Sequence, residues 1–264
     1  MIQDRVGPLP LDAPAPGASF TDLLDSLGAK PTWSLPPGDK PPGIREGTTV
    51  LALRFDNGVV MAGDRRATEG HLVAHRRIRK VFPADRLSAV AIAGTAGLAI
   101  EMVKLFQVEL EHYEKIEGVR LSLEGKASFL ARLVRGQLPM AFQGLVVVPL
   151  FAGFDERESR GRLYSFDVVG GRYEEIDFGG TGSGFREAKA FMRTEYRDDL
   201  TGEEAAELAV RALVAAAQED TATGGPDLRR GILPNVLRIE ADGLVELDDD
   251  EVGSIAERAL EMIQ

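Results

Sequence analysis

The order in which strand-like and helix-like patterns follow one another constrains the fold of this chain more than any single motif. From residue 49 onward, short β-rich runs come first and a pair of long helical patterns follows. The same order then occurs a second time, before a closing hairpin and helix, but with no fixed repeat length. This order favours one α+β domain of antiparallel sheets flanked by helix pairs over an alternating fold with a parallel sheet.

Local signals define the expected elements. Asn57-Gly58 predicts a type I′ hairpin turn, Gly118 a helix stop, and Thr201 with Glu204 a capping box. The charged run 155–160 is expected to be a surface turn. The expected strands are 49–55, 59–63, 71–74, 78–82, 87–93, 145–152, 161–168, 173–176, 235–241 and 244–247. The expected helices are 96–117, 122–142, one opened by the glycines of 180–184 and ending near 196, 201–220 and 248–264.

Residues 1–46 have a different character. They are rich in proline, which removes backbone donors and opposes a packed core, so we expect a largely extended and flexible segment. Ser19 could cap a short helix over 20–27 that Gly28 would stop. The segment lacks the basic start and apolar core of a secretory signal. Both a disordered tail and a propeptide that docks during assembly fit this pattern.

Composition excludes several kinds of function. The formal net charge of −11 argues against a nucleic-acid surface, and no apolar run approaches the roughly 18 residues that a membrane span needs. The absence of cysteine excludes thiolate chemistry and agrees with a reducing cytoplasm. His71 and His75 lie four residues apart, but in a strand-like run that no carboxylate motif completes. We therefore expect no metal, no cofactor, no nucleic acid and no membrane, and proteins or peptides as partners.

The glycines at 180, 182 and 184 precede a helix and could in principle cradle a phosphate. They lack the spacing of a Walker loop or a dinucleotide fingerprint. Nucleotide binding by a partner protein is therefore favoured over binding by this chain.

The junction between Gly47 and Thr48, where the proline-rich segment gives way to an apolar strand, suggests chemistry. A threonine hydroxyl is a weak nucleophile that needs a base, and a free α-amino group on the same residue supplies one. Cleavage before Thr48 would create both groups at once. From the residues alone, Thr49 is an equal rival for the nucleophile.

A set of short motifs occurs along the chain, at 47–50, 60–68, 77–80, 93–97, 182–184 and 220–228. Each motif is weak when taken alone. Taken in order, they resemble the β subunits of the 20S proteasome, in particular the actinobacterial type, and the resemblance extends from about residue 47 to the C-terminus. The family is an N-terminal-nucleophile hydrolase with an αββα sandwich, which agrees with the element order reached above.

The resemblance implies a set of site residues. Thr48 would be the nucleophile, freed by cleavage after Gly47, and its own α-amine would relay the hydroxyl proton. Lys80 would be a cation that stabilises the alkoxide, oriented by Asp64, and Gly94 would present its N–H to the oxyanion. The hydrogen-bond cluster around the terminal amine would consist of Ser183, Asp220 and Thr223, the last standing where the family commonly has serine.

The resemblance also implies how substrate binds. The backbones of Thr68, Gly94 and Ala96 would pair with an extended peptide, which adds a strand to the sheet edge. An apolar, uncharged pocket would receive the side chain before the cut bond, so we expect cleavage after hydrophobic or aromatic residues. Its lining would consist of Ala67, Ile78, Phe82, Ile92, Ala96 and Ile100.

Residues 1–47 are thus expected to be a propeptide removed by autocleavage, and residues 48–264 a catalytic domain. The resemblance implies heptameric β rings stacked between α-subunit rings (α7β7β7α7), an ATP-driven unfoldase that delivers tagged polypeptides, and a cytoplasmic location. Two alternatives are an inactive ring-building subunit and the peptidase of the simpler bacterial unfoldase–peptidase system. The joint presence of Thr48, Asp64 and Lys80 disfavours the first, and chain length disfavours the second.

Overall fold

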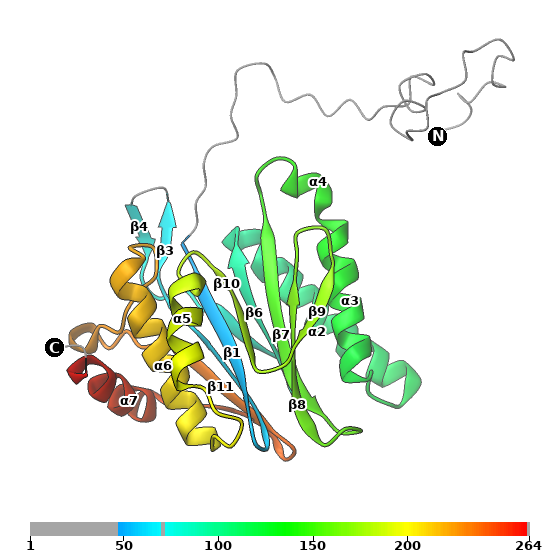
Figure 1. The fold of residues 1–264 in the computed structure, drawn as a ribbon. Coiled ribbons are helices and arrows are strands. Elements are labelled where there is room, and N and C mark those ends of the chain that lie inside the picture. Colours follow the sequence, from blue (N-terminus) through cyan, green and yellow to red (C-terminus); the bar gives the residue numbers. More distant parts are fainter. Residues whose placement is uncertain (1–46, 70–71, 263–264) are drawn as a thin grey trace, which may run out of the picture. The chain divides into compact units, whose positions relative to one another are not determined.

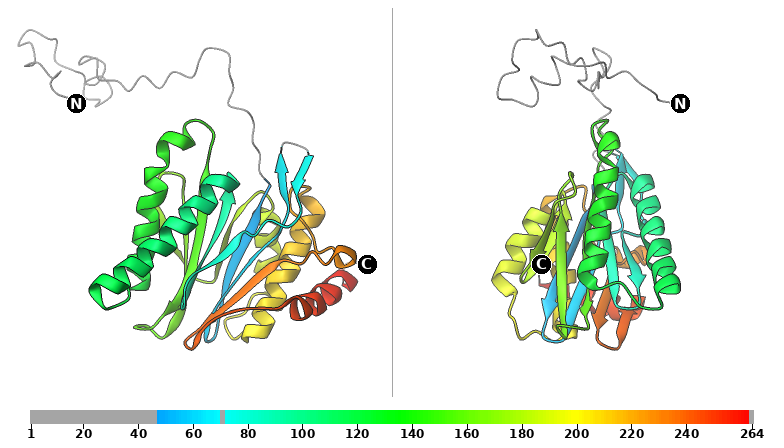
Figure 2. Two further views of the ribbon diagram at one scale, coloured as in Figure 1. Left: turned by 180° about the vertical axis from the view of Figure 1, so that it is seen from behind. Right: turned by 90° about the vertical axis from the view of Figure 1, so that its right-hand side faces the viewer.

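A computed structural model describes residues 47–69 and 72–262, which belong to one compact unit. The expected helix over 20–27, the rest of the leader and His71 lie outside the described residues, so the expectations about them stay predictions. The described residues form the expected α+β sandwich, in which two antiparallel sheets lie between two groups of helices (Figures 1 and 2).

The first sheet carries the start of the described chain. Its strand order is β10-β1-β2-β11-β12, and every neighbouring pair is antiparallel. β1 and β2 form the predicted hairpin, in which Phe55 pairs with Gly58. The predicted type I′ turn on Asn57-Gly58 was wrong, because the two loop residues are Asp56 and Asn57 and neither has the positive φ that this turn type needs. The strands are β1 (Thr49–Phe55), β2 (Gly58–Gly63), β10 (Phe178–Gly182), β11 (Asn235–Glu240) and β12 (Gly243–Glu246).

The second sheet has the order β5-β6-β7-β8-β9 and is also antiparallel. A separate short hairpin, β3 (Ala67–Glu69) with β4 (Leu72–His75), precedes it in the chain. Of the turn expected over 155–160, residues 156–159 are exposed between β7 and β8, whereas Asp155 ends β7 and is buried and Arg160 begins β8. The strands are β5 (Val81–Asp85), β6 (Ser88–Gly94), β7 (Val147–Asp155), β8 (Arg160–Phe166) and β9 (Arg172–Glu175).

The helices cover the outer faces of the two sheets. α5 (Phe185–Glu195), α6 (Gly202–Glu219) and α7 (Asp249–Glu261) form the group on the first sheet, and α6 begins with the predicted capping box. α2 (Ala96–Glu117) and α3 (Leu123–Gly136) cover the second sheet. The remaining short helices are α4 (Leu138–Ala141) and η1 (Leu228–Arg230).

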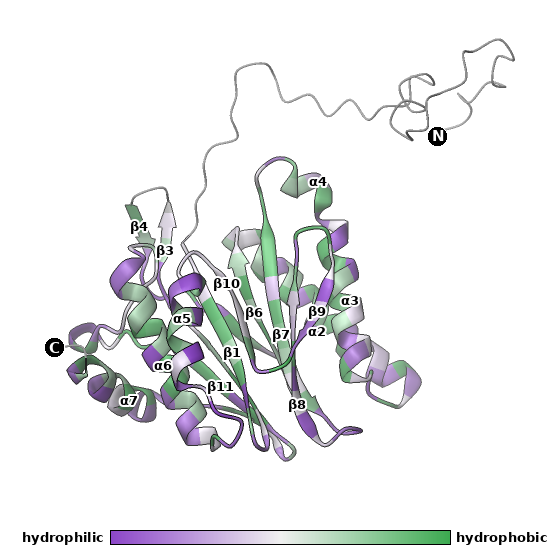
Figure 3. Ribbon diagram, viewed as in Figure 1, coloured by the Kyte–Doolittle hydropathy of each residue, from purple (hydrophilic) through white to green (hydrophobic). Residues whose placement is uncertain are grey.

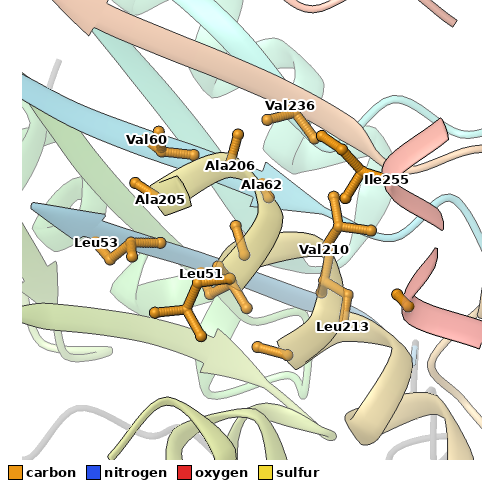
Figure 4. Close-up of a cluster of buried hydrophobic side chains, with 14 of the residues drawn as sticks. Leu51, Leu53, Val60, Ala62, Ala205, Ala206, Val210, Leu213, Val236 and Ile255 are labelled. Atoms are coloured by element: carbon orange, nitrogen blue, oxygen red, sulfur yellow. The ribbon is translucent and has the colours of Figure 1, made fainter. Parts of the chain in front are cut away.

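Three apolar clusters hold these layers together. One lies between the first sheet and α6, where Leu51 and Leu53 of β1 share a cluster with Ala205 and Leu213 of α6 (Figure 4). Another lies between the second sheet and α2 with α3, and the third between the two sheets. β1 supplies alternate residues to two of them, because successive side chains of a strand point to opposite faces. Apolar colour accordingly continues along β1 and its neighbours (Figure 3).

Several expected elements were wrong in detail. The strand expected over 78–82 begins only at Val81 and continues to Asp85, and β3 was not expected. The helix expected over 122–142 is divided into α3 and α4, because Pro139 lies at the start of α4 and has no N–H for a continuous helix. The glycine run that was expected to open a helix instead forms the end of β10, and the helix begins only at Phe185.

Candidate active site

Thr48 lies immediately before β1, and its carbonyl is fixed by the end of β10. The Ser183 N–H donates to the Thr48 carbonyl oxygen over 2.8 Å, next to the Thr49–Gly182 register pair. Thr48 is 5% exposed and Thr49 is fully buried. Figure 1 shows this end of β1 beside β10. The predicted nucleophile is therefore attached to the end of an inner strand of a packed sheet.

Asp64 and Lys80 form a buried ion pair next to the Gly47–Thr48 bond. Lys80 Nζ lies 2.5 Å from Asp64 Oδ1, and the two side chains are 3% and 0% exposed. The same Nζ donates to the carbonyl oxygens of Arg66 at 2.5 Å and Gly47 at 3.4 Å. The cation thus contacts the carbonyl of the bond that is predicted to be cut.

The Asp64 carboxylate is satisfied on both oxygens. Oδ1 accepts the Thr49 N–H, and Oδ2 accepts the N–H groups of Arg66 and Gly224, each over 2.9 Å. Burial is the largest influence on the pKa of Lys80 and lowers it below its usual value, against the opposing pull of Asp64. The lysine therefore gives up a proton more readily than an exposed lysine does.

Ser183, Asp220 and Thr223 also come together, as predicted. The hydroxyls of Ser183 and Thr223 each donate to Asp220 Oδ2 over 2.6 Å. Ser183 Oγ also lies 3.4 Å from the Thr48 carbonyl oxygen, which links the cluster to the nucleophile residue. Burial alone would raise the pKa of Asp220, but the two hydroxyls and the Ala222 N–H hold it below its usual value.

Gly94 ends β6 and borders a small pocket that Thr48 also lines. Its φ of +108° lies where glycine is favoured, and an added Cβ would stand 2.0 Å from the Val146 carbonyl oxygen. The remaining predicted residues that line the pocket are Ala67, Ile78, Lys80, Ile92, Ala96 and Ile100.

Phe82 is a departure from the predicted lining. It is absent from the pocket wall and packs instead on the cluster between the second sheet and α2, with the Arg79 guanidinium 5.7 Å from its ring centre. Arg79 and Ala99 line the pocket but were not predicted. The lining is thus not wholly uncharged, although the Arg79 guanidinium is bound elsewhere, by Glu246 at 2.8 Å.

Sequence reasoning missed two contributors. The Thr49 hydroxyl joins the Asp220 cluster, 2.5 Å from Thr223 Oγ1, and accepts the Gly184 N–H over 3.0 Å. Close packing explains the glycine run. A Cβ added to Gly182 would lie 1.9 Å from the Thr48 carbonyl oxygen, and one added to Gly180 would lie 2.4 Å from the Phe185 ring. The doubled threonine and the alternating glycines were the available signals.

Within residues 47–69 and 72–262, no cluster of three or more His, Cys, Asp or Glu residues is arranged to hold a metal ion. No helix in that part of the chain is long and apolar enough to cross a membrane.

The fold and the residues at the start of β1 define a class of protein first. Two antiparallel sheets between two groups of helices, with a threonine immediately before an inner strand, form the fold of the N-terminal-nucleophile hydrolases. The family described as proteasome subunit matches residues 44–227.

Relatives at about half identity cover nearly the whole chain. A proteasome subunit beta of Acidimicrobium ferrooxidans is 53% identical over 250 residues, which cover 94% of this chain and 92% of the relative. That of Streptomyces griseus is 52% identical, covering 97% and 92%, and that of Acidothermus cellulolyticus is 49% identical, covering 96% and 90%. The chain belongs to the proteasome subunit family and is similar to its actinobacterial β subunits. Membership indicates a hydrolase of the peptidase class that assembles with other proteasome subunits.

Proposed function

We propose that this chain is a catalytic proteasome β subunit, a threonine endopeptidase made as a precursor and activated by its own cleavage at Gly47–Thr48. The observation that carries the proposal is the buried Lys80–Asp64 pair, whose ammonium reaches the Gly47 carbonyl oxygen at 3.4 Å. A buried cation is costly unless it is paired. The Lys80 ammonium also donates to the Arg66 carbonyl oxygen, and its contact with the Gly47 carbonyl oxygen places a cation at the bond that we propose is cut.

The first reaction is the cleavage of the precursor. Thr48 Oγ1 attacks the carbonyl carbon of Gly47, and Lys80 donates a hydrogen bond to the carbonyl oxygen as negative charge develops there. The C–N bond breaks and the proton lost by the Thr48 hydroxyl is transferred to the Thr48 nitrogen, which leaves Gly47 joined to Thr48 as an ester. Water then hydrolyses the ester, releasing a carboxylate on Gly47 and both a free hydroxyl and a free α-amine on Thr48.

The second reaction repeats this chemistry on a substrate. The Thr48 α-amine takes the hydroxyl proton as Oγ1 attacks the scissile carbonyl, and the Lys80 ammonium stabilises the alkoxide. The Gly94 N–H binds the oxyanion, while Ser183 and Asp220 hold the amine in place. The amine returns its proton to the leaving peptide nitrogen, and water then hydrolyses the acyl-enzyme.

Substrate binds as an extended strand along the backbone of Thr68, Gly94 and Ala96, with the residue before the cut in the pocket beside Thr48. The apolar side chains of Ala67, Ile78, Ile92 and Ile100 support a preference for hydrophobic residues.

The particle is built from heptameric β rings stacked between rings of α subunits, in the cytoplasm. An ATP-dependent unfoldase delivers tagged polypeptides to it. Enclosure of the site in such a chamber separates an unselective peptidase from folded cell protein. Family membership and the relatives named above support this assembly.

Co-expression with an α subunit tests the proposal against an inactive ring subunit. The wild-type chain should lose about 47 residues, by the position of the proposed bond, and cleave a fluorogenic peptide. Thr48→Ala should retain the leader and be inactive, while Thr48→Ser, which keeps the hydroxyl, should retain part of both activities. Leader loss and peptide cleavage by Thr48→Ala would refute the assignment.

A further inference from the structure

The residue after the proposed nucleophile, Thr49, has a hydroxyl that the chemistry above does not use. Its Oγ1 lies 2.5 Å from Thr223 Oγ1 and accepts the Gly184 N–H over 3.0 Å. Thr223 Oγ1 in turn lies 2.6 Å from Asp220 Oδ2. Thr49 and Thr223 are both 0% exposed, so water does not compete for these contacts.

The chemistry of the groups fixes the direction of every hydrogen bond in this chain of contacts. An ionised carboxylate only accepts, so Thr223 donates its single hydroxyl proton to Asp220. Thr49 must therefore donate to Thr223, because two hydroxyl oxygens 2.5 Å apart share one proton and that of Thr223 is already committed. The Thr49 oxygen is then free to accept from the Gly184 amide. Each proton has one available position.

Gly184 gives independent support, because any side chain at this position would occupy the space that the oxygens of Thr49, Thr223 and Asp220 fill. An added Cβ would lie 2.5 Å from Thr223 Oγ1, 2.8 Å from Thr49 Oγ1 and 3.1 Å from Asp220 Oδ2. Its φ of −92° suits any residue, so backbone conformation does not call for glycine here. Steric contact with the three oxygens does.

Thr49 also reaches the other carboxylate of the site. Its backbone N–H donates to Asp64 Oδ1 over 2.9 Å, on the oxygen that receives Lys80. One residue thus contacts Asp64 through its backbone and Asp220 through Thr223, and Thr48 is covalently attached to it.

We propose that Thr49 is a positioning residue, which holds Thr48 in register between the Asp64–Lys80 pair and the Asp220–Ser183 pair. It acts through the hydroxyl chain Gly184–Thr49–Thr223–Asp220, in which Thr223 is already a member of the expected site. The proposal rests on the proposed function, because it assigns Thr49 a role in the chemistry of Thr48. The Thr49 hydroxyl touches no reacting atom. The two adjacent threonines thus have different roles: Thr48 is the nucleophile, and Thr49 holds Thr48 in position.

The test compares Thr49→Val, which keeps the shape but removes the hydroxyl, with Thr49→Ser, which keeps the hydroxyl, each in the particle assembled with α subunits. We expect Thr49→Val to lower both kcat and the rate of precursor cleavage by about 10- to 100-fold, the scale of a misplacement of about 1 Å at a reacting centre. KM should stay within about threefold, because no substrate contact is lost. Thr49→Ser should restore kcat to within a few fold of wild type, which loss of packing alone would not predict.

A second variant keeps the proposal falsifiable if Thr49→Val fails to assemble. Gly184→Ala retains every hydroxyl but displaces the chain of contacts, so it should lower kcat in the same direction. Wild-type kcat in an assembled Thr49→Val particle, or in Gly184→Ala where Thr49→Val does not assemble, overturns the proposal. If Thr48→Ala is inactive and Thr49→Val behaves as wild type, only this inference fails. If Thr48→Ala remains active, the proposed function fails and this inference fails with it.

Discussion

Substitution of Gly47 by alanine should slow cleavage of the precursor without affecting the mature enzyme. A Cβ on Gly47 would lie 2.1 Å from Ala222 Cβ and 2.7 Å from the Ala222 carbonyl oxygen. Carbon atoms in ordinary contact are about 3.5–4.0 Å apart, so residue 47 must move by more than about 1 Å. A displacement of that size at a reacting carbonyl costs on the order of 100-fold in rate. We therefore expect Gly47→Ala to be processed about 100-fold more slowly than wild type.

Intact mass, followed over time after purified precursor is mixed with α subunits, measures this rate. Gly136→Ala is the matched control, because an added Cβ there meets nothing within 4 Å. Ala222→Gly combined with Gly47→Ala should restore part of the rate, since it removes the 2.1 Å contact but leaves the carbonyl oxygen. Particles that do mature from Gly47→Ala should have wild-type kcat, because residue 47 departs with the leader. Processing of Gly47→Ala within about twofold of wild type would refute the reasoning.

Three further outcomes follow from buried charges and from the pocket. Lys80→Met should abolish cleavage of the precursor and lower its free energy of unfolding by about 3–5 kcal/mol, because the buried Asp64 carboxylate loses its cation. Urea denaturation of the precursor measures the change in the free energy of unfolding, and a loss below about 1 kcal/mol contradicts the prediction. Burial raises the pKa of Asp85, but Lys126 at 2.5 Å holds that pKa below its usual value. The ion pair therefore stabilises the fold fully when the pH is above the pKa of Asp85 in the unfolded chain. This stabilisation is lost as the pH falls through the lower pKa of Asp85 in the folded protein. Lys126→Met should therefore cost more at pH 7 than near pH 3, and equal losses at both pH values would exclude the pair as the cause. In a fluorogenic peptide panel, cleavage after Leu or Phe should exceed cleavage after Arg or Asp by on the order of 10-fold or more in kcat/KM, since an unpaired charge is costly to bury in an apolar pocket; strongest cleavage after Arg or Asp would show that the pocket is misassigned.

Local signals in the sequence correctly predicted those features of the fold that depend only on residues close together in the chain. The hairpin after Phe55, the helix stop at Gly118 and the capping box at Thr201 each depend on a few neighbouring residues, and each is present, although the hairpin turn lies on Asp56-Asn57. β10 was missed because its glycines pack against β1, which lies more than 120 residues earlier in the chain. The division between α3 and α4 was open to prediction, since Pro139 alone accounts for it.

The site could not be assembled from spacing, because its groups come from segments that only the tertiary fold brings together. The Lys80–Asp64 contact spans 16 residues and the Thr49–Thr223 contact spans 174. Family resemblance supplied the pairing of Lys80 with Asp64. It left out Thr49, which in sequence is one more β-branched residue at the start of a strand.

The geometry also bears on which of the two adjacent threonines is the nucleophile. The Thr49 oxygen already accepts the Gly184 amide and its proton is committed to Thr223, so attack by it would require breaking two buried hydrogen bonds. Thr48 borders the pocket instead. The carbonyl before Thr48 faces Lys80, whereas the carbonyl before Thr49 accepts the backbone N–H of Ser183, a neutral and weaker donor. Since a cut bond needs both a free hydroxyl and a polarised carbonyl, these contacts favour Gly47–Thr48 over Thr48–Thr49 as the bond that is broken.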